Sequence, residues 1–229
     1  MKQYETLAEV LQDIEFHKRF GYPVPQELMD EKARLEERER IDENEYIFST
    51  MKANNKFMSE DKERVIREMA DQLLVDGPHA SEPCLLLGKV QCGKTDTFES
   101  IMGLTMDRGI DVCVVFTKPT NTLADQTIKR LNADFKYFAD NGRIDQKVVV
   151  YIFDILDLIK RGLPGGLVDN PRNKFIIVCK KESKNLQHLI DLFKEKTPEL
   201  KRRRTLIVDD EADFASRAQP KFQKIPYIY

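Results

Sequence analysis

Tryptophan is absent from the 229-residue chain, and cysteine and histidine are scarce. The four cysteines, Cys84, Cys92, Cys113 and Cys179, form no C-x-x-C pair, and the three histidines show no ligand spacing. A disulfide scaffold and a zinc site are therefore not expected. No apolar run approaches transmembrane length, and the charged N-terminal segment does not resemble a signal peptide. We expect a cytoplasmic protein.

Charge is abundant but nearly balanced. Charged residues make up 33% of the chain and hydrophobic residues 41%, and the formal net charge is −2. This apolar share can fill a core, whereas the small net charge disfavours the binding of polyanions by bulk electrostatics. Any nucleic-acid surface must therefore be a local patch.

The hydrophobic pattern changes near residue 80. Before that point, the apolar residues recur at helical spacing. The expected helices comprise one that includes Leu7 to Ile14, a highly charged one over 26–47, and one that begins after a cap at Ser59. We interpret residues 1–80 as a helical N-terminal region.

After residue 80, short apolar runs alternate with helical stretches. Such runs are typical of strands buried on both faces of a parallel sheet, with helices as the crossovers. The expected strands cover 84–87, 112–116, 148–153, 175–179 and 206–208. The expected helices lie near 94–107, 121–139, 154–161 and 183–195. The pattern predicts an α/β domain over 81–229 with a doubly wound parallel sheet.

A phosphate-binding pattern, G-x-x-x-x-G-K-[ST], matches residues 88–95 at every fixed position. We call this segment the phosphate cradle; it consists of Gly88, Lys89, Val90, Gln91, Cys92, Gly93, Lys94 and Thr95. Its glycines allow a tight loop whose N–H groups converge on an anion, and the helix that follows adds its dipole. The pattern predicts that ATP binds here, that Lys94 reaches its β- and γ-phosphates, and that the Thr95 hydroxyl binds Mg²⁺. Redox sensitivity of Cys92 is an alternative to its being a small residue that fits the loop.

An apolar strand that ends in acidic residues covers 205–213. Next to a phosphate cradle, this pattern predicts that Asp210 holds Mg²⁺ and that Glu211 orients or deprotonates the attacking water. Glu211 and Lys94 are thus the candidate catalytic residues. Asp209 either shares the metal or turns away. The alternative interpretation of these acids is the start of a helix.

Three segments together resemble superfamily-two helicases of the DEAD-like kind, and more closely the Z-one domain group of helicase-like proteins. They are the phosphate cradle, V-F-T-K-P-T-N-T-L-A-D-Q-T over 115–127 with K-R-L at 129–131, and D-D-E-A-D-F-A-S over 209–216. The resemblance implies a three-layer, RecA-like P-loop domain that hydrolyses ATP with Mg²⁺ and acts on nucleic acid, with DNA favoured over RNA. It also implies a role in microbial restriction or phage defence. Cys92 stands where this group usually has serine.

The resemblance further implies a second motor domain, which in such helicases closes the nucleotide site with an arginine finger. No such domain follows the acidic strand, so we expect it in a longer chain or in a partner protein. The isolated chain should hydrolyse ATP weakly. One alternative is a nucleotide-dependent binding module that is inactive without its partner. A GTPase is disfavoured because an N-K-x-D or T-K-x-D guanine-binding motif is missing, and a small P-loop kinase is disfavoured because such enzymes usually lack a D-E-A-D strand.

Three residues at an expected strand-to-helix junction are the main candidates for contact with nucleic acid. Lys118, Thr120 and Asn121 suit phosphate contacts, although Thr120 or Asn121 could instead cap the helix. The pair at 180–181 is a weaker candidate. The basic run at 201–204 precedes its strand, and we expect it to be a solvated cluster on the wrong edge of the sheet.

Overall fold

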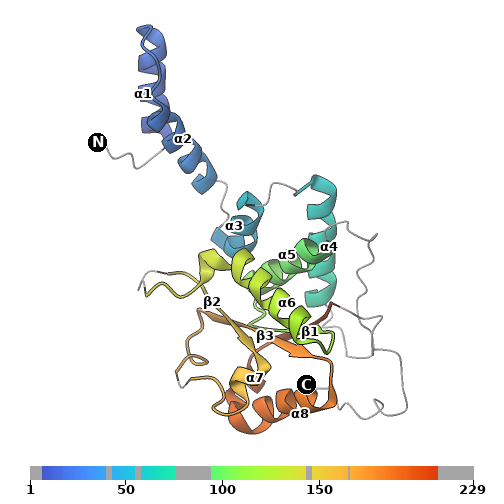
Figure 1. The fold of residues 1–229 in the computed structure, drawn as a ribbon. Coiled ribbons are helices and arrows are strands. Elements are labelled where there is room, and N and C mark those ends of the chain that lie inside the picture. Colours follow the sequence, from blue (N-terminus) through green and yellow to red (C-terminus); the bar gives the residue numbers. More distant parts are fainter. Residues whose placement is uncertain are drawn as a thin grey trace.

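The computed structural model describes residues 7–39, 43–54, 58–75, 94–142, 146–164 and 166–210. Within these ranges, one all-parallel sheet has the strand order β2-β3-β1-β4 (Figure 1). The strands are β1 (Val112–Thr117), β2 (Val149–Asp154), β3 (Asn173–Lys180) and β4 (Thr205–Asp209). These four strands confirm the predicted α/β fold with a parallel sheet. The expected strand at 84–87 lies outside the described residues.

Helices cover both faces of the sheet (Figure 1). On the first face lie α5 (Lys94–Asp107) and α6 (Asn121–Asp134). On the second face lie α7 (Ile155–Leu158), α8 (Ser183–Asp191), a π-helical turn (Leu192–Lys196) and a 3₁₀ turn (Pro198–Arg202). The predicted helices at 94–107 and 183–195 are confirmed in position, whereas those at 121–139 and 154–161 extend too far.

The apolar residues of the central strands explain why both faces are covered. Every residue of β3 is buried, as are five of the six residues of β1. Side chains alternate between the faces, so that Cys113 and Val115 pack toward α5 and α6, whereas Val112 and Val114 pack toward α7 and α8. β4 is more exposed, and the side chain of Ile207 is 50% accessible.

The connections between strands place a topological switch point at the carboxyl edge of the sheet. β1 leads through α6 to β2, while its neighbour β3 leads through α8 to β4. The two connections run in opposite directions across the sheet and use opposite faces, as right-handed crossovers require. The carboxyl ends of β1 and β3 therefore bound a topological switch point, where open α/β sheets bind their ligands.

Two helices from the N-terminal part pack onto α5. They are α3 (Tyr46–Asn54) and α4 (Glu60–Val75), which share a cluster formed by Phe48, Ile66, Ala70, Ile101 and Leu104. The approach of α3 is close at Gly103, where a Cβ atom would lie 2.8 Å from Sδ of Met51. The Ser59 hydroxyl accepts a hydrogen bond from N of Lys62 (3.2 Å), which confirms the predicted cap of α4.

The first two helices form a hairpin that stands away from the sheet in Figure 1. They are α1 (Leu7–Arg19) and α2 (Gln26–Glu39), which meet through Val10, Ile14, Val24 and Leu28. The prediction of one helix over 26–47 is wrong in its extent. After α2, a 3₁₀ turn over Glu43–Glu45 leads directly into α3. None of the helices in the described ranges combines the length and the apolar character that crossing a membrane requires.

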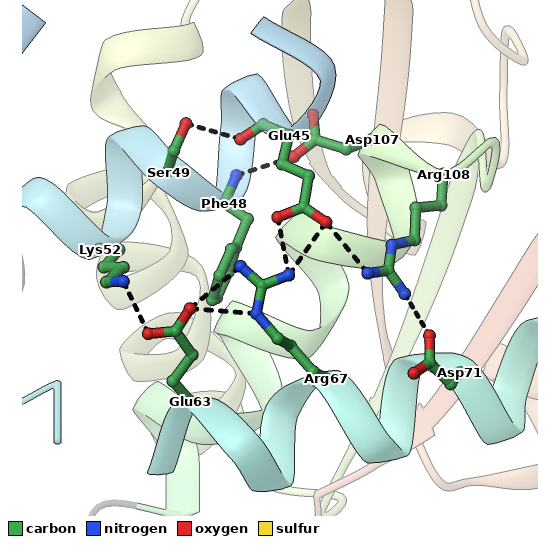
Figure 2. A network of polar contacts seen from close by, with 9 residues as sticks. All are labelled: Glu45, Phe48, Ser49, Lys52, Glu63, Arg67, Asp71, Asp107 and Arg108. Carbon is green, nitrogen blue, oxygen red and sulfur yellow. Dashed lines mark hydrogen bonds and ion pairs between the residues drawn. The ribbon is translucent and has the colours of Figure 1, made fainter. Parts of the chain in front are cut away.

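An ion-pair network ties α3 and α4 to the end of α5 (Figure 2). The Glu45 carboxylate accepts hydrogen bonds from Arg67 at 2.8 and 3.0 Å, and from Arg108 at 3.0 Å. The Asp107 carboxylate accepts from the backbone N atoms of Ile47 (2.9 Å) and Phe48 (2.8 Å). Asp107 thus caps α3 from another helix.

Candidate functional site

The two acids at the end of β4 point to opposite faces of the sheet. Leu206 and Val208 pack toward α5 and α6. Since side chains alternate along a strand, Asp210 continues on that face and Asp209 lies on the other. N of Asp210 donates to O of Phe116 (3.2 Å), which extends the pairing of β4 with β1 by one residue.

Asp209 is bound by a lysine from another strand. Nζ of Lys181 donates to Oδ1 of Asp209 at 2.8 Å. Lys181 directly follows β3, its backbone N donates to O of Thr117 (2.9 Å), and the residue is only 9% exposed. Of the two interpretations of Asp209, this contact favours the one in which the carboxylate turns away from the metal.

Asp210 and Thr95 meet through one guanidinium group. Arg130, in the third turn of α6, donates from Nη1 to Oγ1 of Thr95 at 3.2 Å. Its Nη2 lies 3.9 Å from Oδ2 of Asp210, which is within ion-pair distance. The structure therefore brings together the two predicted metal ligands, one at the start of α5 and one after β4.

A buried acid, Glu99, lies one helical turn after Thr95. Its side chain is 1% exposed, and its Oε1 lies 3.3 Å from Nε of Arg130. Burial raises the pKa of Glu99 to about 9, helped by a hydrogen bond to Asp134 and by the charge of that group, whereas Arg130 opposes the shift. At neutral pH the Glu99 carboxyl is therefore largely protonated.

The chemistry of Thr95 and Asp210 fits a magnesium ion. Magnesium prefers oxygen ligands, and commonly takes one or two from protein while water and substrate phosphates supply the rest. Contact of both groups with one guanidinium shows that a cation is accommodated beside them. Within the described residues, no cluster of three or more His, Cys, Asp or Glu side chains is arranged to hold a metal. A site with a single carboxylate would not form such a cluster.

A second polar group lies at the switch point between β1 and β3. Nζ of Lys180 donates to Oδ1 of Asn121 at 2.7 Å and lies 3.7 Å from Oε1 of Glu182. Thr120 occupies the N-cap position of α6, but its side chain makes no capping hydrogen bond. Its backbone N donates to O of Lys118 at 2.8 Å. The candidate nucleic-acid residues thus share one edge of the sheet with Asp210.

The last two residues of the phosphate cradle, Lys94 and Thr95, begin α5. The other predicted site residues of the cradle and the acidic segment lie outside the described residues; they are Gly88, Lys89, Val90, Gln91, Cys92, Gly93 and Glu211.

The basic run at 201–204 differs from its prediction at one residue. The Arg203 side chain is 15% exposed and lies 3.4 Å from Oδ1 of Asp111. Its Nη2 also donates to the carbonyl oxygens of Val168 and Asn170. The prediction of a solvated cluster is wrong for Arg203, because this side chain binds the loop that contains Val168 and Asn170 at the amino edge of the sheet.

The sequence did not point to Arg130 or Glu99 as site residues, and it gave Lys181 only as a weaker candidate for contact with nucleic acid. A signal exists for Glu99, an acid in the middle of α5 between Phe98 and Ile101, both of which are buried. The arrangement as a whole can hold a cation next to the start of α5. No protein-family model, curated protein or solved structure matches this chain.

Proposed function

We propose that this chain is a RecA-like P-loop ATPase domain that binds ATP with Mg²⁺ and serves a helicase or translocase acting on nucleic acid. The observation that carries the proposal is the contact of Thr95 and Asp210 with the same Arg130 guanidinium. Thr95 ends the phosphate cradle, and Asp210 directly follows the apolar strand β4. P-loop enzymes need these two residue types at one metal ion.

Each residue of the site then has a distinct role. The Thr95 hydroxyl and the Asp210 carboxylate would hold Mg²⁺, which neutralises the charge that develops on the transferred phosphate. Lys94 would bind the β- and γ-phosphates next to the start of α5. Glu211 directly follows Asp210 in the sequence and would orient the attacking water. The contact between Lys181 and Asp209 supports the assignment of Asp210 as the metal ligand, because the Asp209 carboxylate is bound to the lysine instead.

The nucleic-acid part of the proposal is supported by the edge at which the polar residues gather. Lys118, Thr120 and Asn121 follow β1, and Lys180 ends β3. All four lie at the carboxyl edge, where open α/β sheets bind ligands. The resemblance to helicase-like proteins favours DNA over RNA, and a partner or second motor domain would complete the site.

Equilibrium binding of a hydrolysis-resistant ATP analogue tests the proposal. We expect the wild-type chain to bind the analogue in Mg²⁺, and Lys94→Ala and Asp210→Asn each to weaken binding at least about tenfold. Asp125→Asn is the matched control for Asp210→Asn, because Asp125 is an exposed residue of α6. Unchanged affinity in Lys94→Ala would contradict the phosphate cradle. Unchanged affinity in Asp210→Asn would contradict the metal site.

A further inference from the structure

Arg130 contacts both of the groups that would bind Mg²⁺. Its Nη1 lies 3.2 Å from Oγ1 of Thr95, and its Nη2 lies 3.9 Å from Oδ2 of Asp210. We infer that Arg130 is a placeholder cation, which holds these two side chains together until Mg²⁺ and nucleotide bind and displace it. The inference rests on the proposed ATP site and adds a built-in competitor to it.

Electrostatic repulsion is the reason for the displacement. Magnesium lies about 2.1 Å from its oxygen ligands. A metal ion on Oγ1 of Thr95 would therefore lie within about 5 Å of Nη1 of Arg130, if the arginine kept its present contact. A divalent ion and a guanidinium at this separation repel each other, and they compete for the same oxygen lone pairs. Binding of the metal therefore weakens the contacts of Arg130, and the contacts of Arg130 weaken binding of the metal.

Glu99 offers Arg130 an alternative partner. Nε of Arg130 lies 3.3 Å from Oε1 of Glu99, yet among the described residues neither atom has a hydrogen-bond partner. Glu99 is 1% exposed, so water does not readily supply the missing bond. A small rotation of the guanidinium away from Thr95 and Asp210 would align Nε–H with Oε1. The Arg130 side chain is 40% exposed, which leaves room for such a rotation.

The magnesium dependence of nucleotide affinity tests this inference. The full chain would be titrated with a hydrolysis-resistant ATP analogue, once in Mg²⁺ and once in EDTA. Because an ion pair with this exposure contributes little, we expect Arg130→Gln to bind the analogue about twofold to fivefold more tightly in Mg²⁺. In EDTA, where no metal competes with Arg130, the variant should bind no more tightly than wild type.

Two further variants separate competition from other effects. Lys129→Gln removes the same charge from an exposed neighbour on α6 and should leave the Mg²⁺-dependent affinity unchanged. Arg130→Lys keeps the charge but loses the planar fork that spans both oxygens, so its affinity should lie between those of wild type and Arg130→Gln. Thermal melts would establish that each variant is folded.

The possible outcomes distinguish this inference from the proposed function. Equal or weaker binding by Arg130→Gln in Mg²⁺, or an equal gain in EDTA, would overturn the placeholder role while leaving the ATP site intact. If neither wild type nor any variant bound the analogue, the proposed ATP site itself would be contradicted, and the placeholder role with it.

Discussion

Nζ of Lys181 lies 2.8 Å from Oδ1 of Asp209, and this bond joins the carboxyl ends of β3 and β4 across the strand between them. β1 is that intervening strand, and its last residue, Thr117, accepts from the backbone N of Lys181. Asp209, which precedes Asp210, is therefore held by a lysine that follows β3, on the other side of β1. Since Asp209 and Asp210 are consecutive, the lysine also restricts where the candidate metal ligand can lie.

The first prediction concerns this buried contact. Lys181→Met keeps most of the side-chain volume but removes the ammonium group that donates to Asp209, so we expect the free energy of unfolding to fall by about 1–3 kcal/mol. Lys184→Met is the control, because Lys184 is exposed at the start of α8, and its effect should stay below about 0.5 kcal/mol. Urea denaturation measures both values.

A double-mutant cycle decides whether the two side chains interact energetically. Lys181→Met and Asp209→Asn, alone and combined, should show a coupling energy of about 1 kcal/mol or more. Additive effects would mean that the 2.8 Å contact does not stabilise the end of β4.

The second prediction follows from the buried carboxyl of Glu99. Its pKa is raised from 4.5 to about 9, so the folded state retains a proton that the unfolded state has lost. The stability that this group contributes is fully present below pH 4.5 and is lost as the pH rises toward 9. Wild type should therefore lose up to about 1.4 kcal/mol per pH unit within that window.

Glu99→Gln isolates this effect. Glutamine stays neutral at every pH and keeps an N–H that can donate to Asp134. We expect the variant to gain stability relative to wild type as the pH rises from 5 to 8, as measured by urea denaturation at each pH. Glu199→Gln, at an exposed residue, should give a curve parallel to that of wild type. A parallel curve for Glu99→Gln as well would show that Glu99 is ionised in the folded protein.

The third prediction concerns the cap that α5 supplies to α3. Asp107→Ala removes the acceptor for the N–H groups of Ile47 and Phe48, and should cost about 1–3 kcal/mol of the free energy of unfolding. Asp71→Ala in the same network is the control (Figure 2). The Asp71 side chain is 61% exposed, and removing its ion pair with Arg108 should cost less than about 1 kcal/mol. Thermal unfolding of both variants tests whether Asp107→Ala is the more destabilising. Equal losses of stability in the two variants would contradict the role of Asp107 as a cap.

The same cap explains why the sequence did not predict α3. A locally encoded helix start shows its capping residue just before the helix, as Ser59 does for α4. The N–H groups at the start of α3 are instead satisfied by Asp107, which is distant in the sequence. For this reason, the charged pattern over 26–47 predicts one continuous helix. Apolar runs such as 112–116 and 175–179 carry a stronger local signal, because a strand buried on both faces is apolar at nearly every residue, whichever strands it pairs with.

The candidate site likewise contains residues that local motifs predict and contacts that depend on distant parts of the chain. Thr95 and Asp210 could be predicted, since each lies within a motif whose spacing reflects its chemistry. The contacts of Arg130 could not, because they depend on how α6 packs beside α5 and on the end of β4. The pairing of Lys181 with Asp209 depends on strand order, which the sequence alone left open.

The last prediction separates the two edges of the sheet as surfaces for nucleic acid. Lys118 lies between β1 and α6 at the carboxyl edge, whereas Lys201 is exposed in the basic run before β4, at the amino edge. If the carboxyl edge contacts a phosphate backbone, Lys118→Ala should weaken the binding of single-stranded DNA and reduce the slope of log affinity against log salt by about 0.7–1. Lys201→Ala removes the same charge and should change neither quantity. Fluorescence anisotropy at several salt concentrations measures both. Because the net charge of −2 supplies no general attraction for DNA, a local patch must bind it, and a loss confined to Lys201→Ala would assign the DNA to the basic run at the amino edge.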